Sequence, residues 1–277
     1  MPASEDRGAQ PGALAGVDWL GLCRRAAEGV RRELERYPTT SERAVETGRG
    51  EGGDTTLVID RAAEDAVFAE LEALGVPLTA VSEERGEVSI AGGGPVHVVI
   101  DPVDGSLNAK RGLPFASVSI AVASGPTMDA VELGYVAALD PAQEWWAVRG
   151  GGAYEDGEPL PRLRPGPLEV LALETARPRL VGEAAAAIGG LDAKRVRALG
   201  SVAVSLCLVA AGNLDAMLSL RAVRSVDAAA GQLLVREAGG AVAFPEAGEQ
   251  APLGIEMRSR VIAARDAALV ERLLAAF

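Results

Sequence analysis

The feature that most constrains the fold is an apolar run that ends abruptly in two aspartates. It reads VHVVIDPVDGS, from Val96 to Ser106. Short β-branched runs bounded by proline and glycine are typical of buried strands. Asp101 and Asp104, in a turn just past the end of such a strand, would both project to one side of it. Two adjacent carboxylates repel each other unless a cation lies between them, and oxygen ligands of this kind suit Mg²⁺.

A simpler interpretation of this segment is a solvated turn, because aspartate, proline and glycine are ordinary turn residues. The surrounding residues favour the metal site. The string Asp-Pro-Val-Asp-Gly-Ser-x-Asn (101–108) is followed by Gly-x-Pro (112–114) and Val-Ser-Ile (118–120). This pattern resembles the signature of the inositol monophosphatase family, whose members are Mg²⁺-dependent phosphomonoesterases. The resemblance implies an α/β fold, a layered αβαβα sandwich.

Composition argues against several other classes of protein. The formal net charge of −12 disfavours broad electrostatic binding to nucleic acid or to anionic membranes. The sequence has no apolar run of 18 residues, so we predict no membrane span. Cys23 and Cys207 lie in apolar, helix-like patterns and are expected to be buried thiols, as in a reducing cytoplasm. An anionic substrate would then need metal ions or local arginines to hold it.

The organisation of the chain predicts a flexible tail over 1–15 and one phosphatase domain over 16–277. We divide this domain into an α+β half (about 16–165) and an α/β half (about 166–277), without the regular βαβ rhythm of a fully parallel sheet. A glycine-rich loop over 48–54 precedes a helix for which Asp60 is the predicted N-cap. The predicted helices cover 17–36, 60–74, 180–188, 200–212 and 227–238. The predicted strands cover 55–59, 78–81, 96–100, 115–123, 131–139, 144–148, 170–173, 214–218 and 241–244.

Three further acidic segments have ordinary explanations when each is taken alone. Glu83 and the adjacent Glu84 are typical of a solvated surface, Asp54 of a loop, and Asp227 of a helix N-cap. All three nevertheless match family elements in the family's order along the chain. The pair at 83–84 matches an acidic element before the signature, and 227–240 matches the C-terminal Asp-x-Ala-Ala-Gly segment. Asp54 matches the first residue of an upstream pair of aspartates spaced six apart.

The resemblance implies a site with two to three Mg²⁺ ions. Glu83, Asp101 and the carbonyl of Val103 would bind one ion. Asp101, Asp104 and Asp227 would bind a second, and a weaker third ion would lie near Glu83.

The family pattern also implies the groups that act on water and substrate. Ser106 would pair with Asp54 to orient or deprotonate the attacking water, with Glu83 in the same catalytic set. The backbone N–H groups of Gly105 and Ser106 would hold phosphate oxygens. A homodimer is a further family trait that we expect.

The sequence departs from inositol-specific members of the family beside the last metal ligand. Val226 replaces a tryptophan, and Leu220 or Ser219 replaces an acidic residue that binds substrate hydroxyls. Arg221 and Arg224 lie here instead, as in archaeal-type members that act on inositol phosphates and on fructose 1,6-bisphosphate. These arginines could grip a second phosphate, or they could be exposed or paired with local carboxylates.

The favoured hypothesis is therefore a phosphatase acting on a small polyol or sugar phosphate, with inositol 1-phosphate as substrate. Fructose 1,6-bisphosphatase activity, alone or combined, is the close alternative. Hydrolysis of a nucleotide 3′-phosphate such as 3′-phosphoadenosine 5′-phosphate ranks lower, because aromatic residues are only 4% of the chain. A non-catalytic regulatory protein that retains the fold is the alternative from another class.

Overall fold

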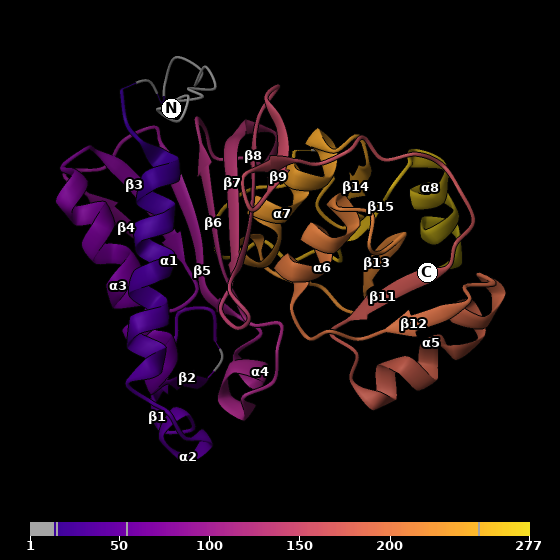
Figure 1. Ribbon diagram of the computed structural model, residues 1–277, viewed down its shortest axis with the longest axis horizontal. Helices are drawn as coiled ribbons and strands as arrows, with labels where there is room; N and C mark the ends of the chain where they lie inside the picture. Colours follow the sequence, from indigo (N-terminus) through magenta and orange to yellow (C-terminus); the bar gives the residue numbers. More distant parts are fainter. Residues whose placement is uncertain (1–13, 15, 54, 249) are drawn as a thin grey trace, which may run out of the picture.

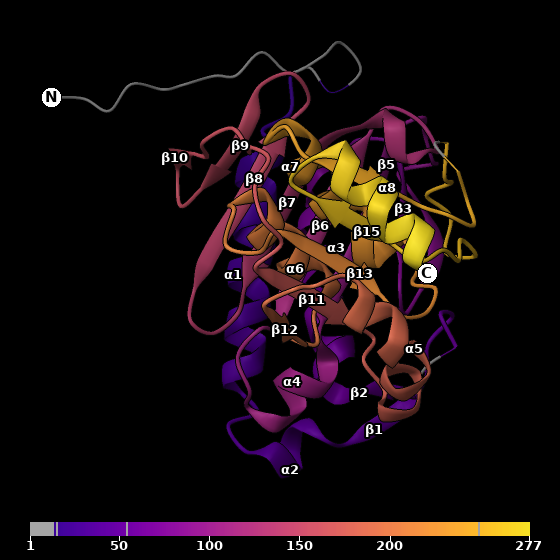
Figure 2. The same ribbon diagram turned by 90° about the vertical axis from the view of Figure 1, so that its right-hand side faces the viewer.

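Two β-sheets alternate with three helical layers in the computed structural model, which describes residues 14, 16–53, 55–248 and 250–277 (Figure 1). One outer layer contains α1 (Trp19–Glu35) and α3 (Val58–Leu74), and the central layer contains α6 (Val202–Ala210) and α7 (Ser225–Glu237). The other outer layer contains α5 (Pro178–Gly190) and α8 (Ala267–Ala276), which lie over the second sheet (Figure 2). The predicted αβαβα sandwich is confirmed.

The first sheet has eight strands in the order β10-β9-β8-β7-β6-β5-β3-β4. Neighbouring strands are antiparallel except for β3 and β5, which run parallel. The strands are β3 (Leu78–Ser82), β4 (Gly86–Ile90), β5 (His97–Asp104), β6 (Ser117–Ala123), β7 (Val131–Ala138), β8 (Gln143–Val148), β9 (Gly152–Glu155) and β10 (Glu158–Pro159).

The second sheet has five strands in the order β12-β11-β13-β15-β14. Its strands are β11 (Val170–Glu174), β12 (Arg195–Arg197), β13 (Ala216–Ser219), β14 (Ala241–Ala243) and β15 (Ile262–Ala264). Strand β11 is parallel to both of its neighbours, whereas β15 is antiparallel to both of its own. The smaller elements are α2 (Thr40–Arg43), α4 (Ser106–Arg111), a 3₁₀ turn η2 (Met128–Ala130) and the hairpin β1 (Glu46–Arg49) and β2 (Thr55–Leu57).

Small residues allow the central helix α7 to lie close to its neighbours. A Cβ atom added at Gly231 would lie 2.6 Å from the Cβ of Leu206 on α6, and one at Gly134 on β7 would lie 2.5 Å from the carbonyl oxygen of Ala230. Residues 225–235 of α7 are all buried. This core has few aromatic rings, and close approach of the backbones fills the space between α7 and its neighbours. The same close packing holds the N-terminus of α7 near the first sheet.

Several local predictions need correction. Asp60 and Asp227 are not helix N-caps, because α3 is capped by Leu57 and α7 by Arg224. Each aspartate is instead the third residue of its helix, and its carboxylate accepts a hydrogen bond from the N–H of the capping residue, at 2.9 and 2.8 Å. The strand predicted to end at Ile100 continues to Asp104. Strands β1, β4, β12 and β15 and helices α2 and α8 lay outside the predicted elements, and β1 includes the first two residues of the predicted loop at 48–54.

Most of the predicted tail lies outside the described residues. Leu14 is buried, and its carbonyl accepts a hydrogen bond from the indole of Trp19. Within the described ranges, no helix combines the length and hydrophobicity needed to cross a bilayer.

Candidate active site

The parallel pairing of β3 and β5 brings two acidic segments to one edge of the first sheet. Ser82, the last residue of β3, pairs with Ile100 on β5. Glu83 follows directly after β3, and Asp101 is the next residue of β5. Because parallel strands end at the same edge, Glu83 and Asp101 become neighbours there although they are 18 positions apart in the sequence. Glu83 and Asp101 therefore start the site that the sequence predicted.

A bulge at the end of β5 determines where the two signature aspartates lie. Asp101 pairs with Ser119 of β6 and Asp104 pairs with Ser117, so three steps on β5 match two steps on β6. In a regular strand, residues three apart point to opposite faces. The extra residue of the bulge removes this alternation, so Asp104 no longer has to face away from Asp101. Both aspartates therefore lie within β5, and not in a turn beyond the strand as predicted.

The N-terminus of α7 completes a group of three carboxylates. Oxygen atoms of Glu83, Asp101 and Asp227 all lie within 4.8 Å of one another. Asp101 and Asp227 are only 2% and 9% exposed. Mg²⁺ binds oxygen ligands about 2.1 Å away in octahedral geometry, so this donor set and its spacing fit that ion. Val103, whose carbonyl was predicted as a ligand, is buried beside them and accepts a hydrogen bond from the Ser106 hydroxyl at 2.9 Å.

Asp104 is held by residues that the sequence did not assign to the site. Its Oδ2 accepts hydrogen bonds from the Ser201 hydroxyl (2.5 Å) and from the N–H of Ala203 (2.7 Å). The same Ser201 oxygen caps α6 by accepting the N–H of Val204. These bonds fix Oδ2 of Asp104, which is not one of the three residues whose oxygens lie within 4.8 Å of one another. A serine just before an apolar helical run was a visible capping signal, but its contact with Asp104 depends on tertiary packing.

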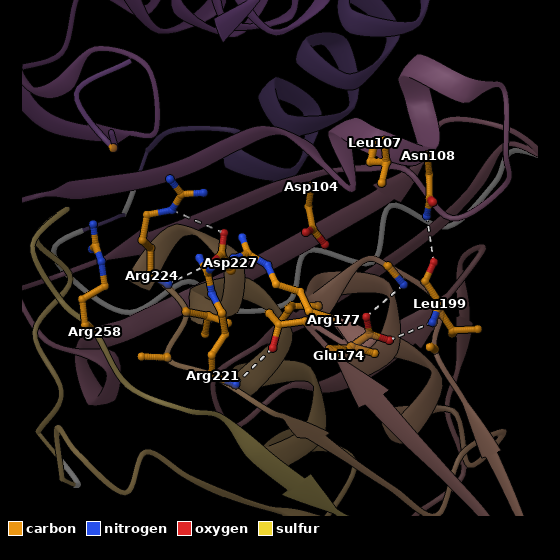
Figure 3. Close-up of a pocket in the computed structure, with 18 of the residues that line it drawn as sticks. Asp104, Leu107, Asn108, Glu174, Arg177, Leu199, Arg221, Arg224, Asp227 and Arg258 are labelled. Carbon is orange, nitrogen blue, oxygen red and sulfur yellow. Dashed lines mark hydrogen bonds and ion pairs between the residues drawn. The ribbon is translucent and has the colours of Figure 1, made fainter. Parts of the chain in front are cut away.

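The segment that carries Ser201 is itself fixed by a buried glutamate. Glu174, at the end of β11, accepts hydrogen bonds from the N–H groups of Leu199 and Gly200 and from the Ser205 hydroxyl. The Asn108 side chain on α4 donates to the carbonyl of Leu199 at 2.7 Å (Figure 3). The second sheet and the signature segment therefore hold the same turn.

The structure places Asp60 beside Ser106, whereas Asp54 lies outside the described residues. Asp60 is 4% exposed, and its Oδ1 has no hydrogen-bond partner among the described residues. Its other oxygen is held by the N–H of Leu57. A buried carboxylate oxygen without a partner is costly and needs a functional explanation. The six-residue spacing from Asp54 was the signal that could have identified Asp60.

Comparison with known proteins agrees with this geometry. A sequence profile of the inositol monophosphatase family matches residues 19–277. The chain belongs to that family. Among its relatives is the fructose-1,6-bisphosphatase/inositol-1-monophosphatase of Methanothermobacter thermautotrophicus, 34% identical over 271 residues that cover 92% of this chain and 95% of the relative.

Two further relatives carry different names. The chain is 37% identical over 198 residues to the Nus factor SuhB of Pasteurella multocida, covering 68% of this chain and 71% of the relative. A crystal structure named inositol monophosphatase-fructose 1,6-bisphosphatase superposes with a TM-score of 0.81 at 26% identity, covering 94% of this chain and all of the other. The family is one of phosphatases, and the names of these relatives do not single out one substrate.

Burial and mutual repulsion raise the pKa values of the acidic residues at this site. Burial raises the pKa of Glu83 to about 8, although the Arg224 guanidinium opposes the shift. Burial raises the pKa of Asp104 to about 7, and the nearby Asp227 charge adds to this rise. Asp101 has its pKa raised well above the usual range, first by burial and then by Glu83 and Asp104. Burial also raises the pKa of Asp60 to about 7. A cation that bound at this cluster would therefore displace protons.

Stability in EDTA is expected to decrease as the pH rises from 6 to 9. The folded-state pKa values of Asp60, Glu83 and Asp104, about 7, 8 and 7, exceed the ordinary values of 3.8 and 4.5. The folded chain therefore binds more protons than the unfolded chain, and this contribution is lost as the pH rises through 7 to 8.

Thermal unfolding in EDTA across this pH range tests the expectation, and a parallel series with excess Mg²⁺ is the control. Mg²⁺ should remove most of the decrease, because ions replace protons at the carboxylates. A melting temperature in EDTA that stays constant or rises over the same range would contradict it.

A pocket of about 650 Å³ opens beside Asp104 and Asp227. Arg177 precedes α5, Arg221 follows β13, and Arg258 comes from the segment before β15; all three line the pocket and are exposed (Figure 3). The side chains of Arg177 and Arg221 have no ion-pair partner among the described residues. Arg177 and Arg258 were not predicted, because neither lies near the signature or the Asp227 segment in sequence.

Arg224 also lines this pocket, but its guanidinium faces the carboxylates of Glu83 and Asp227. Its Nη2 lies 2.5 Å from Oε1 of Glu83, and its Nε lies 3.9 Å from Oδ1 of Asp227. Of the two arginines predicted to bind substrate, only Arg221 is unpaired among the described residues.

Proposed function

We propose that this chain is a Mg²⁺-dependent phosphomonoesterase that acts on a small polyol or sugar phosphate. The observation that carries the proposal is the group of Glu83, Asp101 and Asp227, whose oxygens lie within 4.8 Å of one another. With Asp104 and the Val103 carbonyl, these residues would hold two to three ions. Bound Mg²⁺ would supply the positive charge that stabilises phosphoryl transfer and lowers the pKa of water.

The protein's own groups would orient the water and manage its proton. Ser106 lies between the carbonyl of Val103, to which it donates at 2.9 Å, and the carboxyl group of Asp60. Rotation of the hydroxyl toward Asp60 would let the Asp60 carboxylate accept a proton that Ser106 relays from the water. The N–H groups of Gly105 and Ser106, where β5 turns into α4, would bind phosphate oxygens.

The substrate that we propose is inositol 1-phosphate, with fructose 1,6-bisphosphate as the second candidate. The bisphosphate is kept as a candidate because the exposed Arg177 and Arg221 line a pocket that also holds Asp104 and Asp227, where they could bind a second phosphate. None of the described lining residues is aromatic, so the pocket offers no ring on which a nucleotide base could stack. Some relatives are named Nus factor SuhB, but the cluster of acidic residues here favours catalysis over a purely regulatory role.

Phosphate release from both esters, with Mg²⁺ and with EDTA, tests this function. Release from at least one ester only in the presence of Mg²⁺ is the expected result. Absence of release from both esters and from a wider panel of sugar and polyol phosphates would reject the proposed activity.

Replacing Arg221 by alanine tests the assignment of a second phosphate. We expect kcat/KM for fructose 1,6-bisphosphate to fall about tenfold, equivalent to about 1.4 kcal/mol, while kcat/KM for inositol 1-phosphate changes less than twofold. Arg179→Ala on α5 is a matched control, since this arginine pairs with Glu183 and does not line the pocket. Equal losses for both substrates would show that Arg221 does not recognise the second phosphate.

A further inference from the structure

We propose that Arg224 is a positioning residue that clamps Glu83 and the loop at 50–53 onto the N-terminus of α7. This inference rests on the proposed metal-dependent function. It assigns to Arg224 the support of the predicted metal ligand Glu83, in place of the substrate binding predicted from the sequence. Arg224 is the N-cap residue of α7, three residues before Asp227. It therefore links the helix that supplies one predicted ligand to the turn that supplies another.

The ion pair between Arg224 and Glu83 is shielded from solvent. The two side chains are 15% and 14% exposed, and the pair is 2.5 Å long. A guanidinium held this way restricts both the position and the rotation of the carboxylate. The pair uses Oε1 of Glu83, so the carboxylate can present Oε2 to an ion. The backbone N–H of Arg224 is separately bonded to Oδ2 of Asp227, and a side-chain substitution leaves that bond in place.

The loop at 50–53 packs directly against this pair. The N–H of Gly52 donates to the carbonyl of Glu83 at 2.9 Å, and the N–H of Glu51 donates to the carbonyl of Glu84 at 3.1 Å. A Cβ atom at Gly52 would lie 2.6 Å from Nη1 of Arg224 and 3.1 Å from the carbonyl oxygen of Glu83. Glycine at 52 therefore allows the guanidinium and the loop backbone to approach each other. A methyl group added at position 52, or a shorter side chain at position 224, would disturb this contact.

The loop at 50–53 also precedes the segment that carries Asp60. It lies immediately before β2 and α3, whose third residue is Asp60. The Thr56 hydroxyl in β2 donates a short hydrogen bond to Glu84, beside the clamped Glu83. Loss of the Arg224 contact should thus loosen the loop and Glu83 together, because they share one set of contacts.

Hydrogen exchange in EDTA measures the clamp without any contribution from catalysis. We expect the amides of Glu51 and Gly52 to exchange at least tenfold faster in Arg224→Gln than in the parent chain, with an intermediate rate in Arg224→Lys. Gly52→Ala should produce the same acceleration with Arg224 intact, which keeps the test valid if Arg224→Gln folds poorly. Arg32→Gln on α1, 65% exposed and distant from the site, is the matched control for loss of charge and should leave both amides unchanged.

Calorimetric titration with Mg²⁺ supplies the second readout. Arg224→Gln is expected to weaken Mg²⁺ binding at least fivefold, because Glu83 is no longer held. Unchanged exchange at Glu51 and Gly52 would overturn the proposal. Unchanged Mg²⁺ binding would also overturn it, and tighter binding would show that Arg224 competes with the ion. Lack of phosphatase activity in the parent chain would instead count against the proposed function. The exchange result would still test the contact between Arg224, Glu83 and the loop, because it does not depend on catalysis.

Discussion

Replacing Asp101 by asparagine is expected to abolish Mg²⁺-dependent phosphate release and to stabilise the chain in EDTA. Asp101 is 2% exposed and lies within the carboxylate group, so its charge is costly without a cation. Asparagine keeps an oxygen that can accept the Val103 N–H, now bonded to Asp101 Oδ1 at 3.0 Å. We expect kcat/KM to fall on the order of 10³-fold or more, equivalent to about 4 kcal/mol. Unfolding in EDTA should cost about 1 kcal/mol more than in the parent chain.

Steady-state kinetics and chemical denaturation in EDTA measure these two effects on the same preparation. Asp192→Asn, at an exposed position after α5, is the control and should change neither quantity. Retention of activity in Asp101→Asn would remove this residue from the metal site. Lower stability in EDTA would show that the carboxylate makes favourable contacts that outweigh the repulsion from its neighbours.

Replacing Asp60 by asparagine should lower kcat by about 10²- to 10³-fold and change KM by less than about threefold. An asparagine side chain can occupy the same buried position, but it cannot accept a proton from Ser106. Ser106→Ala should show a similar loss, whereas Ser106→Thr keeps the hydroxyl and should retain most of the activity. Asp54→Asn, measured beside them, distinguishes the pairing predicted from the sequence from the one that the structure favours.

The pH dependence of kcat in the presence of excess Mg²⁺ gives an independent check on Asp60. If Asp60 accepts the proton, the acidic limb of the profile should be altered in Asp60→Asn and preserved in Ser106→Thr. An unchanged acidic limb together with a small change in kcat would make Asp60 a structural carboxylate only.

Local sequence patterns were sufficient for the elements with strong signals. The apolar run before Asp101, the buried helix near 200–212 and the small-residue helix after Asp227 all appear close to their predicted positions. The weaker elements β4, β12 and β15 are short or contain many polar residues, so their pairing depends on neighbours distant in sequence. The caps of α3 and α7 were missed for a related reason. An aspartate at the third helical position can reach back to the capping N–H, and the sequence does not distinguish this from an N-cap.

The sequence by itself determined the family and the layered αβαβα fold, because the signature around 101–120 is long and chemically specific. It also predicted Glu83, Asp101, Asp104 and Asp227 as metal ligands, but it assigned Asp54 rather than Asp60 to Ser106. Only the tertiary structure decided how these residues meet. The β3–β5 pairing brings Glu83 to Asp101, the close packing of α7 brings Asp227, and Ser201 fixes one oxygen of Asp104. It also decided that Arg224 faces Glu83 while Arg221 faces the pocket. The physical reason is that a carboxylate's partner and pKa depend on groups that lie close in space, and those groups come from segments far apart in the chain.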